Sequence, residues 1–343
     1  MKILHVYCTI MLFLMSCNQE KPTGNIIDLS EIPIQQVEFE TLPLDTSKII
    51  YPMGIMVLGE HLVLATPKEE KLFSFWNRKT IEYEFSSTIK GQGPDDIGFL
   101  DVLYLYSSDS CIRVLDNNTE VEMKLEGNQL KTIKRTPIII GDAVNGLMRI
   151  ADNHYIMDGA TYKADFEHYR YDGENVTKFG QFPEPNESIK DYEVVLFNQK
   201  QSIHKQEKDI FFNFYYYLNL VRQYDINGKL LKEIHLKGMP QKENTYQAYM
   251  NKTDKPCTPY WDRTRATNKN IYVMFYQGQT CNELWKKDRI SPPKTEIQVW
   301  DWDGNLKGRY SFDKSFSNFT VSEDGIMYAY DLYKGDAIYR YKF

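Results

Sequence analysis

The sequence predicts an all-β protein: a six-bladed β-propeller with four-stranded blades, whose ring is closed by an N-terminal strand that completes the last blade. Three observations predict this fold. Aromatic residues make up 14% of the chain, including 25 Tyr, and such residues favour half-buried pleated sheets. A strand pattern recurs six times with a period near fifty residues, which is typical of propellers. A single alternating strand near the N-terminus stands outside these repeats.

The repeat is clearest in the third strand of each blade, which ends on an aromatic or apolar residue followed in most copies by a polar residue. Successive copies end 49, 46, 53, 76 and 41 residues apart, and an insertion accounts for the long interval. Asp-Gly and Asn-Gly pairs follow several copies, at Gly173, Gly228 and Gly304, and they supply the positive φ of tight hairpins. The six copies are residues 71–76, 120–125, 166–171, 220–224, 296–300 and 336–341.

A similar strand precedes each copy, and a further strand follows five of them. The sixth outer strand is missing because the chain stops at Phe343, and the alternating run 36–42 can supply it. Such closure removes open sheet edges. The alternatives are two stacked sandwiches or a seven-bladed ring, but six copies and one closing strand favour six blades. Candidate inner strands are residues 53–58, 99–105, 144–150, 193–197, 260–266 and 316–321.

The N-terminus predicts export. Lys2 precedes an apolar run at residues 3–15, which is shorter than the about 20 residues of a membrane-spanning helix and fits a signal peptide. Leu14-Met15-Ser16-Cys17 resembles the lipobox of bacterial lipoproteins, although Met15 is bulky for its position; the alternative is an ordinary secretory signal. We expect a signal peptide at 1–16, a lipidated Cys17 with a flexible tether at 17–35, and a propeller at 36–343. The protein would then be lipid-anchored at the outer membrane or cell surface.

The charge and the cysteines narrow the choice of partners and covalent links. A net charge of −6 without basic low-complexity tracts argues against a nucleic-acid partner. Cys257 and Cys281 are equidistant from the turn at Lys269, so they should face each other across a strand pair and form a disulfide in an oxidising compartment. Cys111 lies in a blade strand, and we expect it to be a buried apolar residue.

A short motif between the first two blades carries a family resemblance. The segment Lys90-Gly91-Gln92-Gly93-Pro94-Asp95-Asp96-Ile97-Gly98-Phe99 resembles the Gly-Gln-Gly-Pro-x-Glu-Phe segment of the TolB-like six-bladed propeller lipoproteins of Bacteroidetes. It departs from that segment after the proline, with Asp96 in place of Glu and two residues before the Phe. Together with the lipobox and the blades, the resemblance covers nearly the whole chain. It implies the fold and the location, and adds little about activity.

The unusual connections all fall on one face of the predicted ring. They are the Gly-Gln-Gly-Pro segment, expected at the channel mouth, the connection 237–258 and the insertion 277–295. Residues 237–296 hold eleven Lys and Arg against six Asp and Glu, and a basic rim with aromatic residues suits an anionic ligand or a sugar. The alternative is a solvated polar rim. The candidate ligand-binding residues are Lys90, Gln92, Asp95, Asp96, Trp261, Arg263, Trp285, Lys286 and Arg289.

The sequence contains no nucleophile elbow, zinc-protease motif, phosphate loop or EF-hand loop. His61 and His154 occupy equivalent positions in separate blades, so we expect no histidine metal site, and we assign no cofactor and no catalytic residue. We predict a monomeric, non-catalytic binding propeller that uses its loop-rich face to bind a glycan, a peptide or a protein. The alternative, supported only by analogy of fold, is a lyase or hydrolase that acts on sugars or peptides at the channel mouth.

Overall fold

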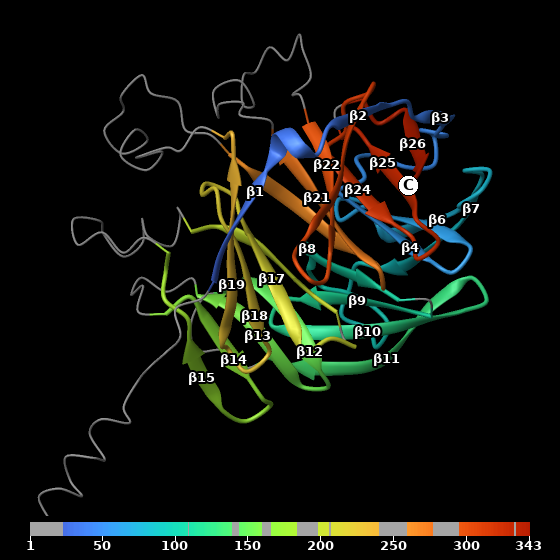
Figure 1. Ribbon diagram of the computed structural model, residues 1–343. Coiled ribbons are helices and arrows are strands. Elements are labelled where there is room, and N and C mark those ends of the chain that lie inside the picture. The colour runs from blue at the N-terminus through green and yellow to red at the C-terminus, as the bar shows by residue number, and fades with distance from the viewer. Residues whose placement is uncertain are drawn as a thin grey trace, which may run out of the picture.

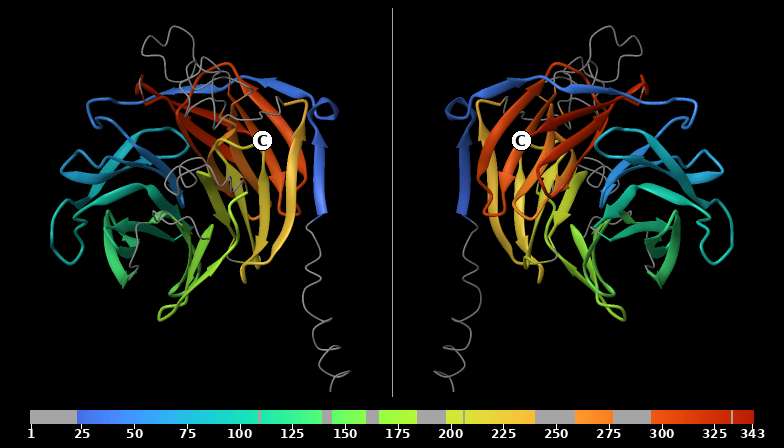
Figure 2. Two further views of the ribbon diagram at one scale, coloured as in Figure 1. Left: turned by 90° about the vertical axis from the view of Figure 1, so that its left-hand side faces the viewer. Right: turned by 90° about the vertical axis from the view of Figure 1, so that its right-hand side faces the viewer.

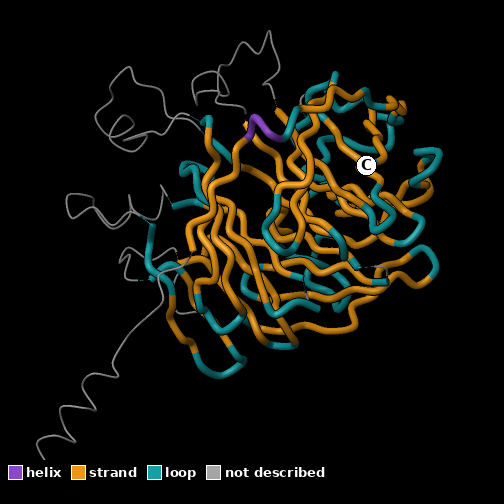
Figure 3. Tube along the Cα trace, viewed as in Figure 1, coloured by secondary structure: helices purple, strands orange, loops and turns teal. Residues whose placement is uncertain are grey.

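A computed structural model (Figure 1) describes residues 23–343 except 109, 139–143, 160–165, 184–197, 206, 240–258, 277–294 and 333. The described residues form 26 strands and one short 3-10 helix, η1 (Leu29–Glu31). The strands make six sheets that lie around a central axis, and Figure 3 shows that strands form the greater part of the described chain. The predicted six-bladed propeller is therefore confirmed.

In each of the first five blades, four antiparallel strands follow chain order outwards from the axis, and in blade 6 the N-terminal strand β3 takes the fourth place. Blade 1 contains β4 (Gly54–Leu58), β5 (His61–Ala65), β6 (Lys71–Asn77) and β7 (Tyr83–Ile89). Blade 2 contains β8 (Leu100–Ser107), β9 (Cys111–Asp116), β10 (Thr119–Glu126) and β11 (Gln129–Pro137). Blade 3 contains β12 (Val144–Ala151), β13 (His154–Gly159), β14 (His168–Tyr171) and β15 (Val176–Phe179).

The second half of the ring is built in the same way, with strands from the N-terminus added. Blade 4 contains β16 (Lys200–His204), β17 (Ile210–Tyr215), β18 (Val221–Asp225) and β19 (Leu230–Lys237), with β1 (Thr23–Asp28) outside β19. Blade 5 contains β20 (Trp261–Ala266), β21 (Asn270–Tyr276), β22 (Thr295–Asp301) and β23 (Leu306–Phe312), with β2 (Ile34–Val37) outside β23. Blade 6 contains β24 (Asn318–Val321), β25 (Ile326–Tyr330), β26 (Ala337–Lys342) and β3 (Glu40–Pro43).

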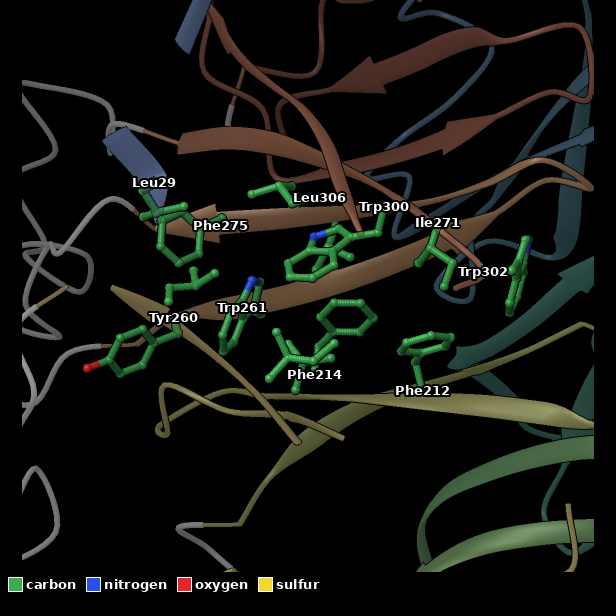
Figure 4. Close-up of a cluster of buried hydrophobic side chains, with 14 residues drawn as sticks. Leu29, Phe212, Phe214, Tyr260, Trp261, Ile271, Phe275, Trp300, Trp302 and Leu306 are labelled. Atoms are coloured by element: carbon green, nitrogen blue, oxygen red, sulfur yellow. The ribbon is translucent and has the colours of Figure 1, made fainter. Parts of the chain in front are cut away.

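The hydrophobic core is divided into clusters that lie between neighbouring blades. In β17, Phe211 packs against blade 3, whereas Phe212 and Phe214 pack against blade 5 (Figure 4). Successive side chains of a strand point to opposite faces of its sheet, and both faces of a blade are covered. This explains why the sequence Ile-Phe-Phe-Asn-Phe-Tyr of β17 shows no apolar–polar alternation. Cys111 is buried and free, as predicted.

The two ends of the ring differ, and we name them by their connections. The short-turn face carries the turns between first and second strands and between third and fourth strands. Several of these turns place a glycine at positive φ, as at Gly127 (58°), Gly228 (93°) and Gly304 (85°), a conformation that costs glycine little. The loop-rich face carries the connections between blades and those between second and third strands. Every first strand therefore runs from the loop-rich face to the short-turn face.

The N-terminal chain closes the ring, but with a different division from the one predicted. The alternating run 36–42 is shared between two blades: β2 pairs in parallel with β23, and β3 pairs antiparallel with β26. Phe39, between them, stacks on Phe312 with ring centroids 4.2 Å apart. The predicted flexible tether at 17–35 is also wrong from residue 23 onward, because β1 pairs along the edge of β19. The outer strands of blades 4 and 5, β19 and β23, supply the backbone hydrogen-bond partners of β1 and β2.

Candidate functional site

The first strands of four consecutive blades enclose a cavity of about 150 Å³ in the central channel. Its lining residues lie in the later parts of β8, β12, β16 and β20, so the cavity occupies the half of the channel nearer the short-turn face. Apolar side chains form much of the wall, and the charged or titratable ones are few. The lining consists of Leu103, Tyr104, Leu105, Tyr106, Arg113, Leu147, Met148, Arg149, Ile150, Gln201, Ser202, Ile203, His204, Thr264 and Arg265.

The irregular shape of β8 helps to open this cavity. Its pairing with β9 is interrupted between Leu100 and Leu105, so the strand bulges there. Leu103 is 76% exposed and Tyr106 is 46% exposed, although both lie on a strand at the centre of the ring. Such interruptions re-aim side chains and are frequent beside functional sites. The apolar wall therefore faces an accessible space.

Two of the three arginines in the lining are neutralised by carboxylates from blade 2. Arg149 Nη1 lies 3.0 Å from Glu120 and 3.0 Å from Glu122, and Arg113 Nε donates to Glu122 at 2.9 Å. Burial opposes the charge on Arg149, but the Glu120 carboxylate and its acidic neighbours outweigh this effect and raise the pKa of Arg149. These groups form a closed network with little attraction left for a ligand.

Arg265 differs because Asp262, the acidic neighbour that favours its charge, acts from a distance and forms no ion pair with it. Nη1 donates to the Thr264 carbonyl at 2.7 Å, Nη2 donates to Asn318 Oδ1 at 3.2 Å, and the guanidinium lies 5.9 Å from the ring centroid of Phe319. Within the described ranges, no carboxylate forms an ion pair with it. Burial, reinforced by the nearby Arg263 cation, lowers the pKa of Arg265 to about 10, so the side chain stays charged at neutral pH.

His204 is the one histidine of the wall. Its Nδ1 lies 3.2 Å from the Arg149 carbonyl and its Nε2 lies 3.0 Å from the Lys208 carbonyl. Burial lowers the pKa of His204, which favours the neutral ring at neutral pH. The cavity thus combines an apolar wall with one cation that forms no ion pair among the described residues, and no Asp or Glu is among its lining residues. Such a wall can hold a small anionic molecule that has an apolar body.

The Gly-Gln-Gly-Pro segment lies elsewhere, so its expected place at the channel mouth is wrong. Asp95 accepts from the Thr132 amide at 2.8 Å and from Lys131 at 3.1 Å, both on the outer strand β11. Asp96 accepts from the Gly93 amide at 2.8 Å, which shapes the turn. The segment is held against the periphery of blade 2 by its own polar groups. Lys90 and Gln92 are exposed on this outer part of the loop-rich face.

Trp261 is not available to a ligand, because it lies in the core between blades 4 and 5. It is fully buried, and its Nε1 donates to Gln298 Oε1 at 2.9 Å. Arg263, on the same strand, donates from Nε to the Ser317 carbonyl at 2.8 Å and does not line the cavity. The other predicted site residues lie outside the described residues: Cys17, Cys257, Cys281, Trp285, Lys286 and Arg289.

Sequence reasoning missed the residue that defines the cavity, although a signal was present. The predicted inner strand 260–266 already contained Arg265, but the pairing of β20 with β21 shifts register between Asp262 and Thr264, so the position of Arg263 did not fix that of Arg265. The inner strand of blade 4 was also misplaced: it is β16 (Lys200–His204), while the predicted 193–197 lies outside the described residues. Its polar sequence, Lys-Gln-Ser-Ile-His, is unlike a typical strand because the strand faces the channel.

A second polar cluster lies buried between blades 3 and 4. Glu167 is fully buried and accepts hydrogen bonds from Arg222 at 2.9 Å, from Tyr224 at 2.8 Å and from Tyr215. Lys200 lies 3.3 Å from Asp158 and 3.6 Å from Glu167. Burial opposes ionisation of both carboxyl groups, but the surrounding cations outweigh it and lower both pKa values.

This buried cluster is balanced in charge, and it touches the channel cavity through Ser202, which donates to Asp158 at 3.3 Å. Its groups satisfy one another, as buried charges must, and we regard it as structural. The described residues contain no group of three or more His, Cys, Asp and Glu placed to hold a metal ion. Among them there is also no helix with the length and hydropathy of a membrane span.

Comparisons with known proteins agree with this fold. The family described as TolB-like 6-blade propeller-like matches residues 30–324, while no curated protein matches the sequence. A protein from Bacteroides fragilis described as exported aligns over 93% of this chain and 98% of its own, with 11% identity and a TM-score of 0.54. A member of the DUF4221 family from Bacteroides vulgatus aligns over 90% and 97%, with 10% identity and a TM-score of 0.57.

Proposed function

Starting from the premise that the chain belongs to the TolB-like six-bladed propeller family, we propose that it is an exported, lipid-anchored binding protein. Its ligand site is the channel cavity, and its ligand is a small organic anion. Export and anchoring are supported by the apolar run before Cys17 and by the description of the Bacteroides fragilis structure as exported. The anion site is supported by Arg265.

The observation that carries the anion site is the absence of an ion pair at the Arg265 guanidinium among the described residues. A partly buried cation that forms no ion pair is costly in a folded protein, and an anion in the cavity would reduce that cost. The planar guanidinium suits a carboxylate or a phosphate, which it can bind through two parallel hydrogen bonds. A cavity of about 150 Å³ admits a molecule of about the size of benzene. We therefore favour a small aromatic or aliphatic carboxylate, or the acidic end of a larger molecule.

The chemistry of the wall favours binding over catalysis. General acid–base catalysis requires a carboxyl or imidazole group free to exchange a proton with the substrate. Glu120 and Glu122 are occupied by Arg149 and Arg113, and both nitrogens of His204 face backbone carbonyls. None of the described groups in this wall is positioned as an acid and base pair. The lyase or hydrolase alternative has no comparable support.

Calorimetric titration of the soluble protein, with residues 1–17 removed, tests the proposal. The ligands are benzoate, glucuronate and inorganic phosphate, each as the sodium salt at constant ionic strength. We expect saturable binding of at least one anion to the wild type. The Arg265→Gln variant should weaken it tenfold or more, because a charge-assisted hydrogen bond contributes roughly 1.5–3 kcal/mol.

Arg170→Gln is the matched control for this titration. Arg170 lies on β14, away from the cavity, and its guanidinium donates to Asn227 on the short-turn face. Removal of this charge changes the net charge as Arg265→Gln does, so a difference between the two variants isolates the cavity. Binding that is equal in both variants, or no saturable binding of any anion, would contradict the proposed site.

A further inference from the structure

The point at which the N-terminal chain leaves the ring is fixed by β1. This strand runs parallel to β19, with Thr23 opposite Lys232 and Asp28 opposite Lys237. Because β19 starts at the short-turn face and runs toward the loop-rich face, Thr23 lies near the short-turn face and β1 leads away from it. Figure 2 shows β1 standing alongside the outer strand of blade 4. Thr23, the residue to which the preceding chain is joined, therefore lies on the short-turn side of the ring.

Several contacts at the other end of β1 hold this strand against the ring. In addition to the backbone hydrogen bonds between β1 and β19, the Lys237 side chain donates to Asp28 at 2.7 Å. Arg309 Nη1 donates to the carbonyl oxygens of Leu29 and Ile32 at 3.1 and 3.2 Å, and the same guanidinium is paired with buried Glu296 at 2.9 Å. The Leu29 side chain is only 9% exposed, in the core between blades 4 and 5. The strand β1 is thus part of the folded ring, and its attachment fixes the position of Thr23.

We propose that the short-turn face of the propeller is turned toward the lipid bilayer. The inference rests on the proposed lipid attachment at Cys17. Only six residues lead from Cys17 to Thr23, and six residues span at most about 20 Å when fully extended. A flexible chain of that length spans on average about 13 Å. The ring is therefore held close to the bilayer by its short-turn side.

The opposite orientation does not fit this tether. From Lys232 to Lys237 the chain climbs five residues, or about 17 Å at 3.3 Å per residue, before the connections of the loop-rich face begin. With that face on the bilayer, the tether would use nearly its whole length to run back along the ring. No reach would then remain to pass the connections themselves.

The turns of the short-turn face are polar and carry charges of both signs, so this face can lie beside the bilayer without entering it. Its turns contain polar pairs such as Asp172-Gly173, Asn227-Gly228 and Asp303-Gly304, and Lys79 and Lys229 are exposed there. Lys79 is paired with Glu60 at 3.1 Å, and acidic residues such as Glu174 and Asp324 lie in turns of the same face, so the orientation depends on the length of the tether and not on charge. The cavity lies in the same half of the channel, so the orientation places the proposed ligand site on the membrane side of the ring.

The test measures the distance of three surface sites from the membrane in the full-length lipidated protein. The protein is reconstituted into phosphatidylethanolamine and phosphatidylglycerol vesicles that contain a rhodamine-labelled lipid. Single exposed lysines are replaced by cysteine and labelled with a donor fluorophore: Lys79 and Lys68 at opposite ends of blade 1, and Lys229 at the short-turn face of blade 4. The parent protein treated with the same dye measures labelling of its own cysteines.

We expect energy transfer to the lipid to be strong from the Lys79→Cys and Lys229→Cys proteins and weak from the Lys68→Cys protein. A ring standing on its edge at blade 4 would give strong transfer from Lys229→Cys alone, and a ring with its loop-rich face on the bilayer would give the strongest transfer from Lys68→Cys. Either result overturns the orientation. Insertion of twenty Gly and Ser residues after Lys21 should reduce the difference between the two blade 1 sites.

Flotation of the same vesicles separates the orientation from the anchoring on which it rests. If the protein floats with the vesicles and the three sites show equal transfer, the anchoring stands and the orientation is wrong. If a Cys17→Ser protein floats as well as the wild type, or the wild type does not float, the lipid attachment is wrong and the orientation falls with it. Neither outcome affects the calorimetric test of anion binding in the cavity.

Discussion

Replacement by glutamine should change the free energy of unfolding in opposite directions at two arginines that differ in their charged partners, Arg222 and Arg265. Arg222 lies 2.9 Å from fully buried Glu167 and 2.7 Å from Glu233, so Arg222→Gln leaves a carboxylate buried without its main partner. Removal of one partner of a buried pair costs about 3–5 kcal/mol of unfolding free energy. At roughly 2 °C per kcal/mol for a chain of this size, Tm should fall by about 6–10 °C.

Arg265→Gln should not be destabilising. The pKa of Arg265, lowered to about 10, corresponds to a cost of roughly 3 kcal/mol for keeping the charge in the cavity wall. The substitution also removes two hydrogen bonds, to Thr264 and Asn318, which contribute about 1 kcal/mol each. The expected net effect is a gain of about 1 kcal/mol in the free energy of unfolding, with lost anion binding as the counterpart.

Urea unfolding followed by tryptophan fluorescence measures both variants. Trp76, Trp261, Trp300 and Trp302 are buried in the folded ring, so their emission should shift on unfolding. Glu60→Gln is the surface control, because Glu60 pairs with Arg78 and Lys79 at an exposed site where such pairs contribute about 0–1 kcal/mol. If Arg265→Gln is as destabilising as Arg222→Gln, the guanidinium of Arg265 is a structural group and the reasoning behind the ligand site is refuted.

Three further predictions concern acid stability, the N-terminal chain and the cysteines. The folded-state pKa values of Glu167 and Asp158 lie below their usual range, so their stabilising effect is present above about pH 4–5 and is lost as the pH falls through the folded values; Glu167→Gln should flatten that part of a stability–pH curve. Arg309→Lys removes the two-pronged contact that a lysine cannot replace, and hydrogen exchange should accelerate across residues 23–37 while the inner strands stay protected. Peptide mass spectrometry of the periplasmic protein should find Cys257 linked to Cys281, and free thiols at both positions would rule the disulfide out.

The repeat could be predicted because it depends on local pattern. Strands such as β6 and β22 have aromatic and apolar side chains at both faces, and they are separated by glycine turns, so the blade count follows from the sequence alone. The inner strands were harder, since β16 is polar: Ser202 and His204 line the channel cavity, and Lys200 belongs to the buried cluster between blades 3 and 4. Polar first strands of this kind look like loops until their neighbours are known.

The candidate site depended on relations that no single segment contains. Trp261 is in an inner strand, yet its side chain points between blades and pairs with Gln298, 37 residues away. Asp95 looked free in the sequence, but Thr132 and Lys131 from the next blade occupy it. Similarly, the pairing of β1 with β19 joins residues about two hundred positions apart. Partners at such separations are set by the closed ring and not by local pattern.

The closure of the ring also dictates an order of events during synthesis. Glu40 meets Arg340, 300 positions later in the chain, so the first strands to be made are among the last to find their partners. At about 5–20 residues per second, β3 waits roughly 15–60 s for β26 to be synthesised. During that interval its unpaired backbone is open to other chains, so the newborn protein needs shielding until its last strand arrives.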